Sequence, residues 1–491
     1  MPTPVAVEDS FFRMKSPEND PAHEAESHQN PRLRPIFYLS VSLSLLHAFQ
    51  YGWSTSQLNY TAYNDDKACQ AEPVQQGTCV LFPGHSKLDW TFMVNAWIFG
   101  GMIGSLGSGY PADALGRRLS IILNSVVMIL GALLQAFSTG VWMFVIGRFV
   151  SGLASGNGTA VLGSYLSEIA PPHRRGSIVS CIQVAVVLGI FLVSITFYVA
   201  DTSLGARVNA GFPALLGVLT LFFSKYLVES PSWLLAHGKG TQARHVLSQM
   251  FGPEHVDIAM SWTSQPHNLE TPSSKKSSSA SESSLHQLFT VYRRQIFVAI
   301  GCSACQQLSG INAVFYYSSD IFQSAGVQDV RVGNLIVNTV NALPTFCIGY
   351  LLPVFQKRKL MLLGLFLMGL SAIGITIALI SDLDALTILF TAVYVAAFAC
   401  SLGPLVWGIT AELLPDHIRA RGQSICLLVN WTCNLLVGIS YPYIADALDD
   451  YGFVPFLALL AVFFVFVYRC LPETYGKTMD EIQAEFTGVY T

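Results

Sequence analysis

The segment EIAPPHRRG, beginning at Glu168, returns in altered form as ELLPDHIRARG, beginning at Glu412. A second landmark repeats at the same interval, because Glu229 follows Glu168 by 61 residues and Glu473 follows Glu412 by 61 residues. One similar pair of motifs is a weak signal, whereas two landmarks at one offset indicate an internal duplication. The sequence therefore predicts two halves of the same design.

The composition places both halves in a lipid bilayer. Of the 491 residues, 52% are hydrophobic and only 12% are charged, and the mean hydropathy is +0.47. Windows of about twenty residues with few charges recur along the chain, which is the length that crosses a membrane as a helix. Twelve spans are predicted, at residues 36–58, 90–112, 118–139, 141–166, 177–200, 207–228, 294–319, 331–352, 359–381, 386–411, 422–444 and 451–471.

The predicted fold class is an all-α membrane protein with twelve transmembrane helices in two six-helix bundles. Parallel repeats of this kind fit a site at the midplane that is exposed alternately to either side. The segment between the halves is polar, and its Ser-rich stretch 271–284 is predicted to be disordered. The predicted domains are a disordered N-terminus (1–35), the first bundle (36–230), a cytoplasmic linker with short helices (231–293), the second bundle (294–472) and a C-terminal tail (473–491).

The basic residues of the short loops predict the orientation. They concentrate on one side, which the positive-inside rule assigns to the cytoplasm together with both termini. These residues are Arg117, Arg118, Arg174, Arg175, Lys357, Arg358, Lys359, Arg419 and Arg421. The N-terminus lacks an apolar signal region, and the plasma membrane is the expected location. The net charge of −4 indicates no nucleic-acid partner.

Two cysteines stand apart from the others. Cys69 and Cys79 lie in the 59–89 loop, which faces the oxidising side, so a disulfide is predicted, with two free thiols as the alternative. Cys302 and Cys305 lie in an apolar helix and are interpreted as packing thiols. Because the chain has no nucleotide-binding loop, HExxH motif, nucleophile elbow or zinc spacing, we expect no metal, no cofactor and no enzymatic activity.

An uncharged polar segment interrupts the seventh span. The stretch QQLSGINAVFYYS begins at Gln306 and holds three amides, at Gln306, Gln307 and Asn312, and the pair Tyr316 and Tyr317. Polar groups in hydrocarbon need partners, and amides offer both donors and acceptors without charge. Such a helix suits a neutral ligand covered in hydroxyl groups, and a sugar has that chemistry.

Many motifs occur together in one order. This set resembles the sugar porter family of the major facilitator superfamily over about residues 36–486, and the facilitative glucose transporters in particular. The motifs begin or lie at Gly109, Asp113, Gly116, Arg148, Glu168, Arg175, Glu229, Gln306, Gly403, Trp407, Glu412, Arg419, Asn430 and Pro472.

The resemblance implies a ligand site and an outer gate. The gate falls on Tyr316 and Tyr317. The implied sugar-binding residues are Gln183, Gln306, Gln307, Asn312, Asn338, Trp407, Trp431 and Asn434. For the amides of the seventh span, hydrogen bonding between helices is the alternative role.

Charged residues gather at the cytoplasmic helix ends. We hypothesise that their ion pairs hold the outward-open state and part in the inward-open state, with plain helix capping as the alternative. The proposed network consists of Asp113, Arg117, Arg118, Arg148, Glu168, Arg175, Glu229, Glu412, Arg419 and Glu473.

Several positions depart from the family pattern. Ala399 stands where the glucose transporters have Glu, Gly163 replaces a proline, and Ser232 replaces an arginine. In the second copy of the basic turn Pro353 stands in place of the carboxylate. These changes put strict glucose selectivity in question and make fructose a further candidate substrate.

The first span lacks the aspartate that proton-driven sugar porters place after an aromatic-Gly-aromatic step, because this position is Ser54. Serine does not titrate near neutral pH, and an intramembrane ionisable group would be the default proton site. The sequence therefore favours a hexose uniporter that works by alternating access as a monomer. The alternatives are a proton-coupled hexose or polyol symporter, with His47 as a titratable group, and a non-transporting sugar sensor.

Overall fold

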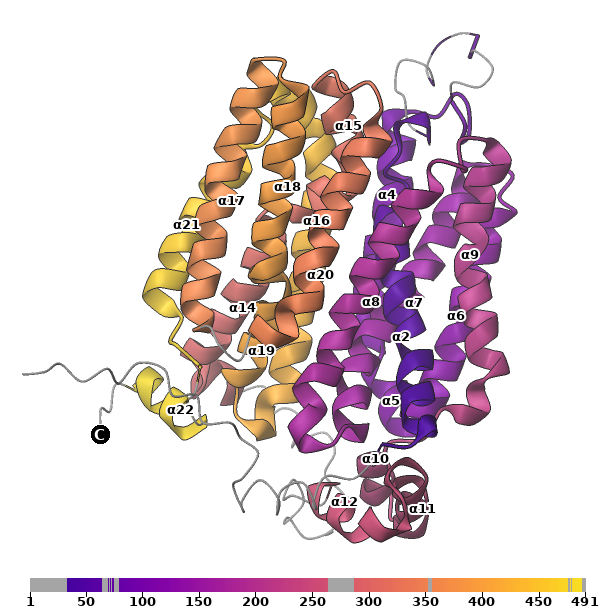
Figure 1. Cartoon of the computed structure of the whole chain (residues 1–491), viewed down its shortest axis with the longest axis vertical. Helices are drawn as coiled ribbons and strands as arrows, with labels where there is room; N and C mark the ends of the chain where they lie inside the picture. Colours follow the sequence, from indigo (N-terminus) through magenta and orange to yellow (C-terminus); the bar gives the residue numbers. More distant parts are fainter. Residues whose placement is uncertain are drawn as a thin grey trace, which may run out of the picture.

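The computed structural model describes residues 33–63, 69, 71, 73–74, 79–263, 287–351, 356–475, 477 and 479–487. These residues form helices and connecting turns, with no β-strand among them. Figure 1 shows the two halves side by side, the first from indigo to magenta and the second from orange to yellow. Of the predicted N-terminal disordered segment only residues 33–35 are described, and the stretch 271–284 lies outside the described residues.

The first half consists of six long helices, one for each of its predicted spans. A short helix, α5 (Gly109–Leu115), continues the second of them. The six are α2 (Pro35–Ser56), α4 (Lys87–Gly107), α6 (Arg117–Ala136), α7 (Val141–Ile169), α8 (Arg175–Thr196) and α9 (Ser203–Phe222).

The second half also follows its six predicted spans, but two of them are broken. The seventh is divided into α14 (Arg293–Leu308) and α15 (Ile311–Ser324), and the tenth into α18 (Asp384–Cys400) and α19 (Leu402–Glu412). The unbroken helices are α16 (Val330–Leu351), α17 (Lys357–Ile380), α20 (Asp416–Leu448) and α21 (Val454–Cys470). The fold is thus the twelve-helix, all-α arrangement that the sequence predicts.

The break of the seventh span rests on one glycine. Gly310 has φ of +86°, a left-handed conformation that residues with a Cβ rarely adopt. A Cβ there would also lie 2.5 Å from Cγ of Phe456. The Tyr394 hydroxyl donates a hydrogen bond to the carbonyl of Ser309, so the interrupted backbone keeps a partner.

By length and hydropathy alone, seven of the described helices qualify as membrane spans, and α21 is a shorter apolar helix. This number is lower than the twelve predicted spans because helices such as α2 carry polar residues that are buried in the bundle. Ser40, Ser44, His47 and Gln50 of α2 are all buried inside the bundle, where they lower the mean hydropathy without facing lipid.

The two ends of the molecule differ. At one end, here called the linker end, lie α10 (Pro231–Ala236), α11 (Gly240–Phe251) and α12 (Val256–Thr263), below the first half in Figure 1. The C-terminal helix α22 (Met479–Thr487) lies at the same end. The other end, here called the disulfide end, holds the loop of Cys69 and Cys79.

The duplication is visible as a repeated helix cap at the linker end. In the first half the Glu229 carboxylate accepts hydrogen bonds from the backbone N–H groups of Arg117 (2.8 Å) and Arg118 (3.2 Å) at the start of α6. In the second half Glu473 accepts from Lys357 (3.0 Å) and Arg358 (3.2 Å) at the start of α17. A carboxylate at a helix N-terminus satisfies unpaired N–H groups and opposes the positive end of the helix dipole.

Burial raises the pKa of the Glu229 carboxyl above its ordinary value, while the backbone N–H groups that it accepts from act in the opposite direction. A Cβ at Gly116, which has φ of +95°, would lie 2.3 Å from Glu229 Oε2. Gly116 therefore provides both the turn and the room for the cap.

Replacing Glu229 with alanine removes the acceptor of two N–H groups in the first turn of α6. Because a buried donor without a partner costs about 1–3 kcal/mol, we expect the unfolding midpoint of the purified protein in detergent to fall, as followed by tryptophan fluorescence. Glu229→Gln keeps one acceptor oxygen and should lose less. Asp113→Ala is the control, since this side chain is 78% exposed, and equal losses in Glu229→Ala and Asp113→Ala would contradict the capping role.

Candidate functional site

A chain of amide side chains joins α14 and α20 near the middle of the second half. Gln307 Nε2 donates to Asn430 Oδ1 at 2.8 Å, and Asn430 Nδ2 donates to Gln306 Oε1 at 2.8 Å. Gln306 Nε2 donates in turn to the carbonyls of Leu402 (3.1 Å) and Gly403 (2.9 Å), next to the break of the tenth span. The amides of α14 thus tie both broken spans to α20.

The chain continues into α15. Asn312 Nδ2 donates to Asn434 Oδ1 at 2.9 Å and also to Gln307 Oε1. The Tyr316 hydroxyl donates to the same Asn434 oxygen at 3.0 Å. We call Gln306, Gln307, Asn312, Asn430 and Asn434 the amide network, and each of these side chains is at most 7% exposed.

The chemistry of the amide network follows from its lack of charge. Each amide supplies two donor hydrogens and an acceptor oxygen, so members can exchange a protein partner for a hydroxyl group of a ligand. In a buried site a hydrogen bond is strong, and an amide group without a partner is costly. The site therefore favours a ligand that satisfies every amide. A neutral, polyhydroxylated molecule meets this condition, whereas an ion would lack a counter-charge.

The two predicted gate tyrosines lie directly beyond the amide network. Tyr317 has non-helical angles (φ −135°, ψ 15°), which place a kink inside α15. Its hydroxyl donates to the carbonyl of Gly438 at 2.9 Å, one turn past Asn434 on α20. Tyr316 and Tyr317 are both buried, so α15 is held closed against α20 in this structure.

Three aromatic rings connect the halves beside the amide network. The Tyr51 ring centroid lies 5.3 Å from Trp97 and 5.7 Å from Trp431, and Trp97 and Trp431 are 5.7 Å apart. Trp431 is 3% exposed, and its ring leaves no room for a Cβ at Gly101. The Trp431 indole of the second half therefore packs against α4 of the first half.

Hydrogen bonds between the halves cluster at the disulfide end. Asn59 Nδ2 donates to Ser318 Oγ at 2.8 Å, and Asn59 Oδ1 accepts from the N–H of Ser319 at 3.0 Å. At the same end Lys87, the first residue of α4, pairs with Asp446 in the last turn of α20. Nearer the middle, Asn95 donates to the carbonyl of Gly438 at 3.1 Å. The structure is a conformation whose halves are joined at the disulfide end.

The structure places Arg148 away from the charged network at the helix ends, contrary to the sequence prediction. It lies two turns into α7, on the disulfide side, and is 1% exposed. Its guanidinium donates to the carbonyls of Ser54 (2.9 Å), Met93 (3.2 Å) and Val94 (3.4 Å), and its Cζ lies 5.5 Å from the Trp97 ring centroid. Among the described residues it makes no ion pair, so backbone carbonyls take the place of a carboxylate.

The linker-end pairs that the structure shows lie within one half each. Arg117 pairs with Glu168 (3.1 Å) and Asp113 (3.0 Å) in the first half, and Lys357 pairs with Glu412 in the second. Lys357 therefore has a carboxylate partner although Pro353 replaces the one expected in the turn. Each of these pairs is intact in this structure, and none of them joins one half to the other.

Other members of the proposed network are not seen in ion pairs; Glu229 and Glu473 cap helices instead. Arg175 is exposed at the start of α8 and makes no ion pair within the part of the chain that the structure describes. The Arg419 side chain lies outside the described residues. Arg118 contributes its backbone N–H to Glu229, and its guanidinium donates to the carbonyl of Ser224 at 3.3 Å.

Besides Trp431, three implied sugar-binding residues stand outside the amide network. Gln183 is half-buried on α8, Asn338 is buried on α16, and Trp407 is 42% exposed on α19. For a Cβ at Gly408, next to Trp407, no atom lies within 4 Å, so this part of α19 borders open space.

Sequence reasoning missed three residues that the structure brings to the site, namely Asn430, Tyr51 and Trp97. Asn430 had a usable signal, because it precedes Asn434 by four residues and thus shares one face of α20 with it. The aromatic contact of Tyr51 and Trp97 with Trp431 joins different halves, and no local pattern reports it.

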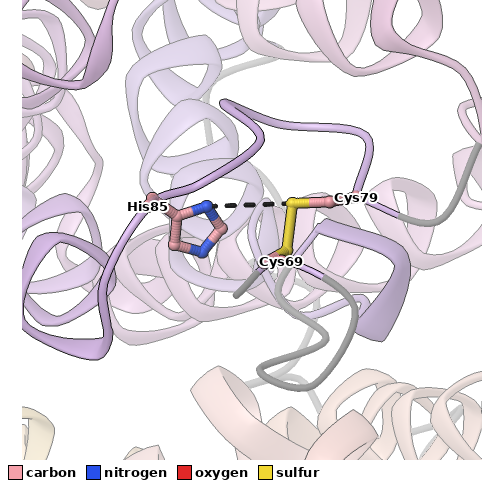
Figure 2. A group of neighbouring side chains, drawn as sticks. All are labelled: Cys69, Cys79 and His85. Carbon is pink, nitrogen blue, oxygen red and sulfur yellow. Dashed lines mark hydrogen bonds between the residues drawn. A yellow bond between two sulfur atoms is a disulfide. The ribbon is translucent and has the colours of Figure 1, made fainter. Parts of the chain in front are cut away.

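Figure 2 shows the loop at the disulfide end. Cys69 and Cys79 form a disulfide with an S–S distance of 2.06 Å, and His85 Nδ1 lies 3.9 Å from Cys79 Sγ. The three side chains have the grouping of a metal site. Because the sulfurs are bonded to each other, neither is a thiolate ligand, and His85 Nδ1 lies 3.0 Å from the carbonyl of Phe82.

Comparison with known proteins places this arrangement in a family. The family model "Sugar (and other) transporter" matches residues 40–486. The chain is 31% identical to facilitated glucose transporter member 1 of Gallus gallus over 475 residues, covering 91% of this chain and 93% of the relative. It is 30% identical to member 4 of Bos taurus over 490 residues, covering 94% and 93%.

Solved structures share the fold. The partially occluded inward-open conformation of the xylose transporter XylE from E. coli superposes with a TM-score of 0.74 at 21% identity, covering 91% of this chain and 100% of that chain. Its inward-open conformation gives a TM-score of 0.73 at 22% identity, covering 91% and 99%. The chain belongs to the sugar transporter family. It is an integral, multi-pass membrane protein of the major facilitator fold and not an enzyme.

Asn59→Ala removes hydrogen bonds that join the turn after α2 to α15 at the disulfide end. We expect this variant to populate a conformation with the disulfide end open, because its remaining cross-half contacts are fewer. Spin labels attached by non-cysteine chemistry at Asp201 and Asp382, one in each half, would report longer distances. Asn157→Ala is the matched control, since its amide bonds to Asn124 within the first half, and identical distance distributions in both variants would contradict this role of Asn59.

Proposed function

We propose that the protein is a facilitative hexose transporter, with D-glucose as substrate and fructose as a further one, that works by alternating access without proton coupling. The observation that carries the proposal is the amide network, a buried and uncharged set of donors and acceptors at the centre of the second half. The printed names of the relatives at 30–31% identity, facilitated glucose transporters, support the same substrate class.

In this proposal the sugar replaces hydrogen bonds that the amides now make with one another. Gln306, Gln307 and Asn312 turn toward the hydroxyl groups, and the exchange conserves the number of hydrogen bonds, so moderate affinity and rapid release follow. The Trp431 ring supports an apolar face of the pyranose. Gln183 and Trp407 approach the sugar from α8 and α19.

The orientation that we propose places the linker end in the cytoplasm, in line with the basic loops. The structure is then closed toward the outside, where Asn59 and Lys87 join the halves, and the sugar leaves on the cytoplasmic side. Movement of α15 with Tyr316 and Tyr317 away from α20 would open the outer side. Each half keeps its own ion pairs during this movement, and the site is complete within one chain, so the monomer is the transporting unit.

The absence of proton coupling rests on Ser54 and Arg148. The Arg148 guanidinium is held by the carbonyl of Ser54 and carbonyls of α4, which do not titrate. A proton-linked switch needs a group whose charge changes, such as a carboxylate beside this guanidinium. His47, the other candidate, is buried with Nε2 3.2 Å from Ser125 Oγ, within the first half and away from Arg148.

Alanine at both Gln306 and Asn312 should strongly reduce transport by removing two members of the amide network. We expect hexose counterflow in proteoliposomes to fall about a hundredfold, as two hydrogen bonds of roughly 1.5 kcal/mol are lost. The control is Gln295→Ala, also on α14, whose amide bonds to Gln483 of α22. Unchanged flux in the double variant would show that the cargo does not pass this network. A protein that binds hexose but gives no counterflow even without substitution would be a sensor.

Ser54→Asp would place a carboxylate beside Arg148. We expect transport by this variant to become dependent on pH, because protonation of the new carboxyl breaks its pairing with the guanidinium. The natural protein should show the same uptake with and without a protonophore, and Ser54→Asn is the uncharged control. If the natural protein accumulates hexose against its gradient under an imposed pH difference, it is a symporter and this proposal is wrong.

A further inference from the structure

A cavity of about 640 Å³ lies at the linker end, between α11, the first turns of α2 and α6, and the segment 225–229 that follows α9. This volume is in the range of small-molecule sites, about 300–1,000 Å³. One face of α11 lines the cavity with Gln242, His245 and Gln249. The cavity is distant from the amide network, and the transport mechanism does not use it.

Three cations line this cavity, namely Arg118, Lys225 and Lys239. Among the described residues none of them pairs with a carboxylate, in contrast to the neighbouring Arg117 and Arg244, which do. Lys225 Nζ lies 5.0 Å from the Tyr226 ring centroid, and Lys239 Nζ lies 4.8 Å from that of Trp233.

The carboxylate in the lining, that of Glu229, already accepts hydrogen bonds from the protein backbone. Of the described residues around the cavity Glu229 alone is acidic. Its Oε1 atom accepts hydrogen bonds from three backbone N–H groups, those of Arg117, Arg118 and Ser230. The cavity therefore presents two to three positive charges without a counter-ion, and an anion of charge about −2, such as a phosphomonoester, would balance them.

The walls of the cavity are fixed before a ligand arrives. Trp233 Nε1 donates to the carbonyl of Asp113 at 2.8 Å, which ties α10 to α5. The N–H of Arg34 donates to the carbonyl of Met250 at 2.9 Å, which ties α11 to the start of α2. Buried Leu247 and Phe251 of α11 pack in one cluster with Phe37 of α2. A preformed site of this kind binds with little ordering cost.

The position of Lys225 points to the source of the anion. Phe222 and Phe223, at the end of α9, are 75% and 37% exposed, as expected for residues that face lipid. Lys225 lies two residues after Phe223, at the depth where basic side chains meet phospholipid headgroups. We propose that this cavity binds the phosphomonoester headgroup of an anionic phospholipid from the leaflet at the linker end, with Arg118, Lys225 and Lys239 as its partners.

The duplication supplies a matched control. The counterpart of Lys225 at the repeat interval is Arg469, which is exposed at the end of α21, and Lys359 is an exposed lysine at the start of α17. The cavity of the first half owes its outer wall to α11 of the linker, which follows the first half only. Removing the two charges of the second half should therefore leave headgroup binding unchanged.

The test uses the full chain in phosphatidylcholine nanodiscs. Adding phosphatidic acid to about a tenth of the lipid should raise the unfolding midpoint of the natural protein and of R469Q/K359Q. In K225Q/K239Q we expect the apparent affinity for phosphatidic acid, measured by native mass spectrometry, to fall about tenfold. Folding of the variants is verified by their unfolding midpoints without phosphatidic acid.

Further experiments with other phosphate compounds and with the variants give results that would overturn the proposal. Phosphatidylglycerol, a phosphodiester, should stabilise less, and an equal effect would show a general response to negative surface charge and overturn the proposal. Stabilisation by soluble glycerol 3-phosphate without a response to phosphatidic acid would overturn the lipid source. Equal losses in K225Q/K239Q and R469Q/K359Q would overturn the assignment of the cavity. Because none of these readouts involves sugar, they are independent of the proposed transport function.

Discussion

The structure depends on hydrogen bonds among uncharged amides in an environment that excludes water. In the low dielectric of a helix bundle an unpaired amide is expensive, so Gln306, Gln307 and Asn312 must have partners at every stage. They find one another and Asn430 and Asn434 of α20. This requirement holds the two broken spans against α20. It also makes the site complementary to a ligand whose hydroxyl groups take over the same hydrogen bonds.

The remaining architecture holds this network in the second half, beside the aromatic contact of Tyr51 and Trp97 with Trp431 that joins the two halves. The carboxylate caps of Glu229 and Glu473 and the pairs of Arg117 with Glu168 and of Lys357 with Glu412 fix helix ends within each half. Contacts between the halves are made by uncharged side chains such as Asn59, by aromatic rings, and by the pair of Lys87 with Asp446. The Asp446 side chain is 63% exposed, so parting this pair costs less than parting a desolvated ion pair. Two rigid halves with weak mutual contacts can rotate relative to each other, which is the motion that alternating access requires.

Much of the fold could be predicted from the sequence, because hydrophobic length and the repeated Glu168 and Glu412 motifs are local signals. The amides of the seventh span were equally visible, since polar groups in an apolar helix need a reason. The break before α19 was not predicted, because the tenth span is apolar on both sides of it. Arg148 was misplaced, because a motif gives the helix but not the depth at which a guanidinium finds its carbonyls. Contacts such as that of Tyr51 with Trp431 depend on how the halves meet.

In the proposed function, hexose binds to a site that is neutral in both its empty and its filled state. Calorimetric titration of the purified protein with D-glucose in two buffers of different ionisation enthalpy, between pH 5.5 and 8.0, tests this claim most directly. We predict the same binding enthalpy in both buffers and one dissociation constant across the range, because no proton is taken up or released. A binding enthalpy that changes with the buffer would show that a titrating group takes part, and it would contradict the account.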